Sequence, residues 1–162
     1  MKKTILGLLL ALCTLSANAQ FEAGKKYVNT SLSGLNLSYS KNTKFCFNLD
    51  ATGGYFLADD WMVMGRLGYA HPGRHQDKFE LGLGGRYYIE QNGLSLGALI
   101  SYEHGHNYNW KTDNWFITPE IGYTFFLNQY LTIEPALYYK MSLNDFSDAS
   151  TVGLRIGLGW YF

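Results

Sequence analysis

The sequence predicts an all-β fold: an eight-stranded antiparallel up-and-down barrel that spans a membrane and follows a cleaved signal peptide. Three observations lead to this prediction. The chain begins with an export signal, its later segments alternate in polarity with a period of two, and the charged residues of those segments share one face. A lipid-facing barrel needs that separation, because a charge at the bilayer midplane costs about 2–4 kcal/mol.

The first 19 residues have the composition of a secretory signal peptide. Two lysines give a basic start, residues 5–15 form an apolar run, and residues 17–19 (Ala-Asn-Ala) fit the small-residue cleavage pattern. The apolar run is shorter than the roughly 18 residues that a membrane-spanning helix requires. We therefore expect residues 1–19 to be the signal peptide and residues 20–162 to form one outer-membrane β-barrel domain.

The composition of the mature chain narrows the classes of fold and partner. The chain holds 13 Tyr, 10 Phe and 4 Trp, and no mature segment is continuously apolar enough for a transmembrane helix. Removing the signal leaves 11 basic and 13 acidic residues. This near-neutral balance gives no electrostatic reason to expect nucleic-acid binding. Cys46 is then the only cysteine, so no intramolecular disulfide can form. The remaining choices are a soluble β-protein and an outer-membrane barrel.

The period-two alternation is clearest in the last twelve residues, 151–162. One face carries only large apolar side chains from Val152 to Phe162, and the other carries glycines with Arg155 and Tyr161. Successive side chains of a strand point to opposite faces. A glycine-rich face with one arginine fits a crowded polar interior rather than open water. This pattern is typical of the closing strand of a membrane barrel.

Eight segments of roughly 10–14 residues have the length of tilted membrane-crossing strands. They are residues 27–39, 44–57, 61–70, 78–89, 94–103, 115–126, 131–143 and 151–162. Short turns at 58–60, 90–93 and 128–130 alternate with longer links, apart from a short link after the first segment. Outer-membrane barrels have short periplasmic turns and longer outer loops, so we expect both termini to be periplasmic.

The large apolar residues fix the lipid face of each segment, and the charged residues then fall on the other face. An eight-stranded barrel is just wide enough for its interior to be filled by side chains. Buried charges must be paired and hydrogen-bonded. We therefore expect a structural network of ion pairs in a polar lumen, formed by Asp50, Arg66, Glu80, Arg86, Glu120, Glu134 and Arg155.

Glycine followed by aromatic residues recurs before the short turns, at residues 54–61, 85–92 and 122–129, and the chain ends in Gly-Trp-Tyr-Phe. With the signal sequence, these motifs resemble the small outer-membrane β-barrel proteins of Gram-negative bacteria, the eight-stranded type of the OmpA transmembrane domain and OmpX. The resemblance implies that Trp160 and Phe162 form the C-terminal signal read by the barrel assembly machinery. It also implies a range of roles: structural support, adhesion, defence and lipid modification.

We expect an integral outer-membrane protein that is a monomer, has no cofactor or enzymatic activity, contacts outer-membrane lipids, and serves membrane structure or an unknown surface partner. The alternative is an enzyme of lipid acyl transfer or deacylation, for which Ser101, Glu103 and His104 near the outer edge are the local hint. Residues 101 and 103 share a face and 104 points the other way. A small pore is a lesser alternative. A soluble lipocalin-like barrel would need its apolar face inside.

All four histidines lie in the expected outer loops: His71, His75, His104 and His106. Histidine is the commonest metal ligand, and adjacent loops could bring these residues together. No helix underlies their spacing, however, so we favour solvated loop histidines and predict no metal site.

Pro119 and Pro135 lie inside two expected strands, where each lacks a donor for the ladder. They suggest a shared bulge or kink.

Overall fold

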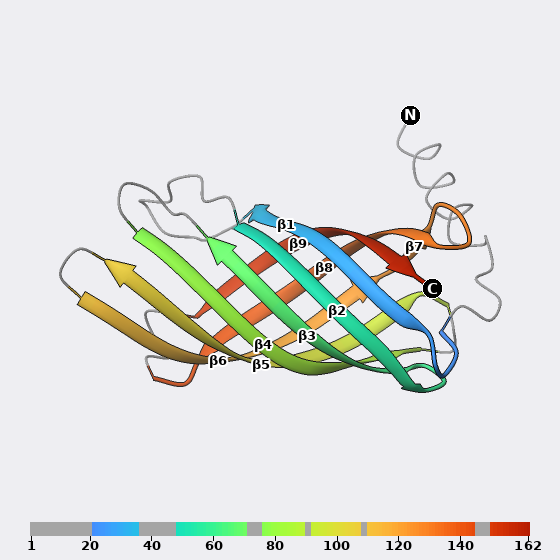
Figure 1. Ribbon diagram of the computed structural model, residues 1–162, viewed down its shortest axis with the longest axis horizontal. Helices are drawn as coiled ribbons and strands as arrows, with labels where there is room; N and C mark the ends of the chain where they lie inside the picture. The colour runs from blue at the N-terminus through green and yellow to red at the C-terminus, as the bar shows by residue number, and fades with distance from the viewer. Residues whose placement is uncertain (1–20, 36–47, 71–75, 90–91, 108–109, 145–149) are drawn as a thin grey trace.

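The computed structural model describes residues 21–35, 48–70, 76–89, 92–107, 110–144 and 150–162, which form a single sheet curled into a barrel (Figure 1). Its strands are β1 (Lys26–Leu35), β2 (Asn48–Ala58), β3 (Trp61–Ala70), β4 (Gln76–Tyr88), β5 (Leu94–Asn107), β6 (Trp110–Tyr123), β7 (Phe125–Phe126), β8 (Leu131–Ser142) and β9 (Thr151–Tyr161). Among the described residues, no helix is long and apolar enough to cross a membrane.

All neighbouring strands are antiparallel. The sheet closes because β1 pairs with both β2 and β9, while β8 pairs with β6 as well as β9. β7 continues β6 after a break at Thr124, so the nine strand segments make eight strands. The predicted eight-stranded antiparallel barrel is confirmed.

The two faces of each strand differ as the alternation predicts. In β9, Ile156 is 52 % exposed and Trp160 is 54 % exposed, whereas Arg155 is 6 % exposed. The same alternation runs through β3, where the outward residues include Val63 and Leu67 and the inward residues include Met64 and Arg66. The outer surface is therefore apolar and the lumen holds the charges.

Aromatic residues lie at both ends of this apolar surface. Tyr69 pairs with Phe79 near the outer end, and the Tyr102 and Trp115 rings lie 5.3 Å apart at the same level. At the other end, Trp61 and Tyr87 lie 4.8 Å apart beside the β2–β3 turn. Such rings favour a membrane interface because one end is apolar and the other can stay wet.

The strands differ most from their predicted bounds at the outer ends of β5 and β6. β5 extends to Asn107 rather than ending at Glu103, and β6 begins at Trp110 rather than Trp115. The ladder from β4 through β5 to β6 continues to this level, where Asn107 pairs with Gln76 and with Trp110. A three-stranded sheet thus rises above the outer aromatic residues (Figure 1).

This extension corrects the placement of two histidines. His104 and His106 lie in β5 rather than in a loop, because the β4–β5 and β5–β6 ladders continue past them. His71 and His75 lie outside the described residues, as do residues 36–39 and 44–47 of the first two expected strands.

Both prolines lie along one seam of the barrel, between β6/β7 and β8. The ladder pairs Ile117 with Met141, is interrupted at the level of Pro119, and resumes where Glu120 pairs with Tyr138. It stops again at the level of Pro135 and resumes when Phe125 of β7 pairs with Ile133. The register does not shift across either gap, so the prolines interrupt the ladder without the suggested bulge.

The hydrogen-bond phase of this seam explains the gaps. The Leu143 N–H donates to the Trp115 carbonyl at 2.9 Å, and the Leu127 N–H donates to the Leu131 carbonyl at 2.8 Å. In an antiparallel ladder the bonded positions recur every second residue. Residues 119 and 135 therefore occupy bonded positions of this seam, where proline has no N–H to donate. Among the described strands, the other seams show at most one register shift, close to a strand end.

Candidate functional site

The candidate site is the lumen, whose side chains form three layers from the turn end to the outer end. An aromatic cluster lies nearest the short turns and comprises Phe21, Tyr27, Phe56, Tyr88 and Tyr161. The central cluster comprises Arg66, Arg86, Glu120, Glu134 and Arg155. The outer cluster comprises Lys78, Glu80, Glu103 and Lys140.

Glu120 holds the central cluster together. One carboxylate oxygen accepts from Arg86 Nη2 at 2.8 Å, and the other accepts from Arg66 Nη2 at 3.0 Å and from Arg155 Nη2. The Glu120 side chain is 2 % exposed. Three guanidiniums from three strands therefore share one buried carboxylate, and removing that carboxylate would leave buried charge uncompensated.

Glu134 joins the central cluster to the aromatic cluster. Its oxygens accept hydrogen bonds from the hydroxyls of Tyr27 at 2.5 Å and Tyr161 at 3.0 Å, and from Arg86 Nη1 at 3.2 Å. Thr132 Oγ1 adds a fourth donor at 2.8 Å. These bonds meet the requirement that a buried carboxylate be fully hydrogen-bonded.

The aromatic cluster closes the turn end of the lumen, and its central member precedes β1. The Phe21 ring is fully buried and stacks on Tyr88 at 3.9 Å. The Phe21 carbonyl accepts from the Asp60 N–H at 2.8 Å, which ties the N-terminal segment to the β2–β3 turn. In that turn, partial burial and then the neighbouring Asp59 carboxylate raise the pKa of Asp60.

The outer cluster closes the opposite end. Lys140 Nζ donates to Glu80 and to Glu103 at 2.6 Å each, and Lys78 Nζ donates to the second oxygen of Glu103 at 2.8 Å. The Lys140 ammonium also lies 4.1 Å from the centre of the Phe116 ring, a cation–π arrangement. Four charges thus compensate one another at the outer mouth.

The seven residues proposed for the lumen network all face the interior, but they do not form one group. Glu80 belongs to the outer cluster. Asp50 lies beside Gly68, where an added Cβ would meet the Asp50 carboxylate at 2.7 Å. Lys78, Glu103 and Lys140 lie on the face that the sequence assigns to charged residues, but the alternation does not predict their partners. It also missed the tyrosine hydroxyls on Glu134, which no charge pattern marks.

Comparison with known proteins gives structural neighbours only. No family model matches the chain, and no curated protein matches its sequence. Solved structures do match the chain, and three of them illustrate the fold that it shares. The N-terminal β-barrel domain of Pseudomonas aeruginosa OprF has a TM-score of 0.67 at 14 % identity, over 86 % of this chain and 98 % of that domain. Ail, the attachment invasion locus protein of Yersinia pestis, has a TM-score of 0.55 at 16 % identity, over 86 % of this chain and 99 % of Ail. Neisserial surface protein A has a TM-score of 0.57 at 12 % identity, over 85 % of this chain and 96 % of that protein.

The chain has the fold of the eight-stranded outer-membrane β-barrels. The structural match covers nearly the whole of each neighbouring barrel. Because the sequence identities are low, the match shows a shared architecture alone. Within this outer-membrane barrel fold, the particular features of the chain are its lumen clusters and its interrupted seam.

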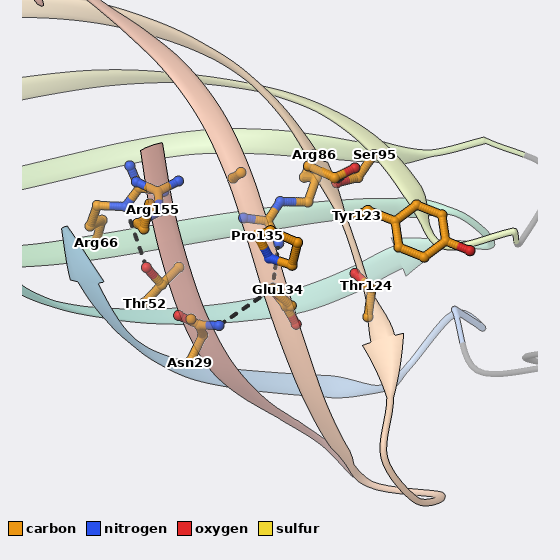
Figure 2. A pocket seen from close by; sticks show the side chains of 13 residues that line it. Asn29, Thr52, Arg66, Arg86, Ser95, Tyr123, Thr124, Glu134, Pro135 and Arg155 are labelled. Carbon is orange, nitrogen blue, oxygen red and sulfur yellow. Dashed lines mark hydrogen bonds and ion pairs between the residues drawn. The ribbon is translucent and has the colours of Figure 1, made fainter. Parts of the chain in front are cut away.

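A small cavity lies within the barrel beside that seam (Figure 2). Its volume is ≈ 10 Å³, about the room that one water molecule takes. Arginines of the central cluster line it together with Glu134, Pro135 and Tyr123. Described side chains occupy the lumen at each of the three levels, as expected for a barrel of eight strands.

The residues considered for lipid chemistry do not come together. Ser101 and Glu103 are buried in the lumen, 2 % and 8 % exposed, whereas His104 is on the outer face of β5. There His104 Nδ1 lies 2.7 Å from Asp113 Oδ1, which also accepts from the Tyr102 hydroxyl at 2.8 Å. The Ser101 hydroxyl and the His104 ring are therefore on opposite sides of the barrel wall.

The described part of the chain contains no group of three or more His, Cys, Asp or Glu residues that could hold a metal ion.

Proposed function

We propose that this protein is an integral outer-membrane barrel, with both termini periplasmic and a closed lumen, which serves membrane structure or contact with a surface partner. The apolar outer surface and its two levels of aromatic residues support the membrane location. The short turns at the end that carries both termini support their periplasmic placement. Trp160 and Phe162, outward-facing at the end of the chain, fit the proposed assembly signal.

The proposal of a closed lumen rests on one observation: side chains occupy the lumen at three levels. The aromatic cluster blocks the turn end, the central ion pairs fill the middle, and the Lys140–Glu80–Glu103 contacts cross the outer mouth. Moving an ion through this lumen would require several buried, hydrogen-bonded pairs to separate. A buried charge that loses its partner is strongly destabilised, which argues against a pore.

The outer sheet supports the surface role. β4, β5 and β6 stay paired beyond the level of Tyr102 and Trp115, so they would carry side chains above the membrane surface. Asn144 Nδ2 donates to the Asp113 carbonyl at 3.1 Å and helps to hold this sheet to the segment after β8. A rigid sheet held above the lipid is suited to contact with another molecule.

Conductance measurements test the closed lumen. The purified protein inserted into planar lipid bilayers should give no stable conductance steps, because neither end of the lumen is open. A larger porin inserted under the same conditions provides the positive control. Reproducible steps from the folded protein would contradict the closed lumen and favour a pore.

A further inference from the structure

Lys26 is a cation on the outer surface of the barrel. It is the first residue of β1 and is exposed, whereas its neighbour Tyr27 is buried in the lumen. Successive side chains of a strand point to opposite faces, so Lys26 faces outward. Its ammonium has no carboxylate partner among the described residues, whereas Lys78 and Lys140 are both paired in the outer cluster. The described part of the chain therefore supplies no counter-charge for Lys26.

Aromatic side chains flank Lys26 on both neighbouring strands. β1 lies between β2 and β9 (Figure 1). Lys26 pairs with Tyr55 of β2 and exchanges two backbone hydrogen bonds with Phe162, at 2.7 and 3.0 Å. Side chains directly opposite each other across a ladder share a face, with Cβ atoms about 4.5–5.5 Å apart. Lys26 thus extends from the middle of a row of exposed rings, at the turn end, where such rings favour the level of lipid headgroups.

Two glycines lower the outer surface next to this row. Gly53 is two residues from Tyr55 along β2, roughly 7 Å nearer the middle of the strand. The row at that level is Val28, Gly53, Gly65 and Leu83, each paired with the next. A Cβ added at Gly53 would meet no atom within 4 Å, and one added at Gly65 would meet Leu83 Cδ2 at 3.6 Å. The two glycines therefore leave open space on the lipid-facing surface between two exposed apolar side chains.

The charge on this part of the outer surface is positive. The other outward-facing side chains at this end of β2 and β9 are uncharged: Tyr55, Leu57, Trp160 and Phe162. The exposed acids nearby, Glu22 and Asp59, lie outside the ladder, before β1 and in the β2–β3 turn. A lysine near a membrane surface attracts anionic lipids. Its long stem can lie on apolar surface while the ammonium stays at the headgroups.

We propose that Lys26 and the pair Gly53–Gly65 form a binding site for a phospholipid with an anionic headgroup. The phosphate lies at the Lys26 ammonium, between the Tyr55 and Phe162 rings, and one acyl chain runs over the two glycines. The lipid belongs to the leaflet at the turn end. This inference rests on the proposed membrane location, and it adds the class of lipid and the place where that lipid is held.

Competition between two phospholipids tests the headgroup preference. Protein purified from outer membranes in non-ionic detergent is mixed with equal amounts of phosphatidylglycerol and phosphatidylethanolamine that carry the same acyl chains. Native mass spectrometry then measures the lipid bound to the folded barrel. We expect phosphatidylglycerol to be favoured by about fivefold, the effect of one lysine on an anionic lipid. Lys26→Gln should bring the ratio to about one, and Lys26→Arg should keep it.

Two glycine variants test the path of the acyl chain. Gly53→Leu fills the open space and should weaken binding of both lipids by about threefold while their ratio stays the same. Gly85→Leu is the matched control, because Gly85 also faces outward but lies in β4, away from Lys26, and binding should stay within about twofold.

The proposal is overturned if the folded wild type binds both lipids equally, or if Lys26→Gln keeps the preference for phosphatidylglycerol. Equal effects of Gly53→Leu and Gly85→Leu would remove the acyl path from the site. Heat-dependent gel migration shows that each variant has folded. Loss of that migration in the wild type would instead contradict the membrane barrel, so the two failures are distinguishable.

Discussion

Replacing Glu120 by Gln should lower the free energy of unfolding by about 3–5 kcal/mol, the largest effect we expect from one polar substitution. The amide keeps the shape of the side chain but removes its charge. Arg66, Arg86 and Arg155 would then face a single carboxylate, Glu134, in a site with almost no exposure to water. Urea unfolding of the barrel refolded in lipid vesicles measures the change.

Glu22→Gln is the matched control for this experiment, because Glu22 is exposed before β1 and its loss should change the stability by no more than about 0.5 kcal/mol. A second variant tests the cause. Adding Arg155→Met to Glu120→Gln removes one uncompensated guanidinium, and the two changes should therefore cost less together than the sum of their separate costs. Strict additivity, or a Glu120→Gln protein as stable as the wild type, would contradict the central cluster.

Replacing Phe21 by Ala should cost about 3–5 kcal/mol, the range for removing a fully buried phenylalanine. The ring packs against Phe56, Tyr88 and Tyr161 and is the centre of the aromatic cluster, although it lies outside every strand. Its loss also weakens the link to the β2–β3 turn, so the Asp60 amide, bonded to the Phe21 carbonyl, should exchange its hydrogen faster.

Phe21→Leu separates packing from aromatic contacts, and it should recover most of the loss because it refills most of the space. Tyr130→Ala is the surface control, since Tyr130 is 55 % exposed in the turn before β8. Should Phe21→Ala unfold at the same urea concentration as Tyr130→Ala and leave the Asp60 amide protected, the N-terminal segment does not close the lumen.

The sequence predicts the fold because membrane barrels repeat one simple rule. Each strand must present apolar residues to lipid and can present charges only inward, so Arg155 and its glycine neighbours mark the lumen face of β9 without any knowledge of the other strands. The same rule places Glu120 and Glu134 inside. Register is the missing information: which cation meets which carboxylate depends on the stagger of all eight strands, which no local pattern encodes.

The remaining differences have similar causes. Phe21 precedes the first strand, and alternation says nothing about a residue outside a strand. The outer ends of β5 and β6 carry His104 and Asp113 on the outward face, where a charge pattern typical of a loop is tolerated once the strand has left the apolar level. The two prolines are evident in the sequence. Only the alternation of bonded and non-bonded pairs in the structure shows that both missing N–H groups would have served the same seam.

The migration of unheated protein on a denaturing gel tests the membrane barrel most directly. We predict that the protein is extracted from outer membranes only with detergent, and that an unheated sample migrates faster than a boiled one because the closed barrel resists the denaturant. Release from the periplasm without detergent, together with identical migration of heated and unheated samples, would contradict a lipid-facing barrel with a charged lumen.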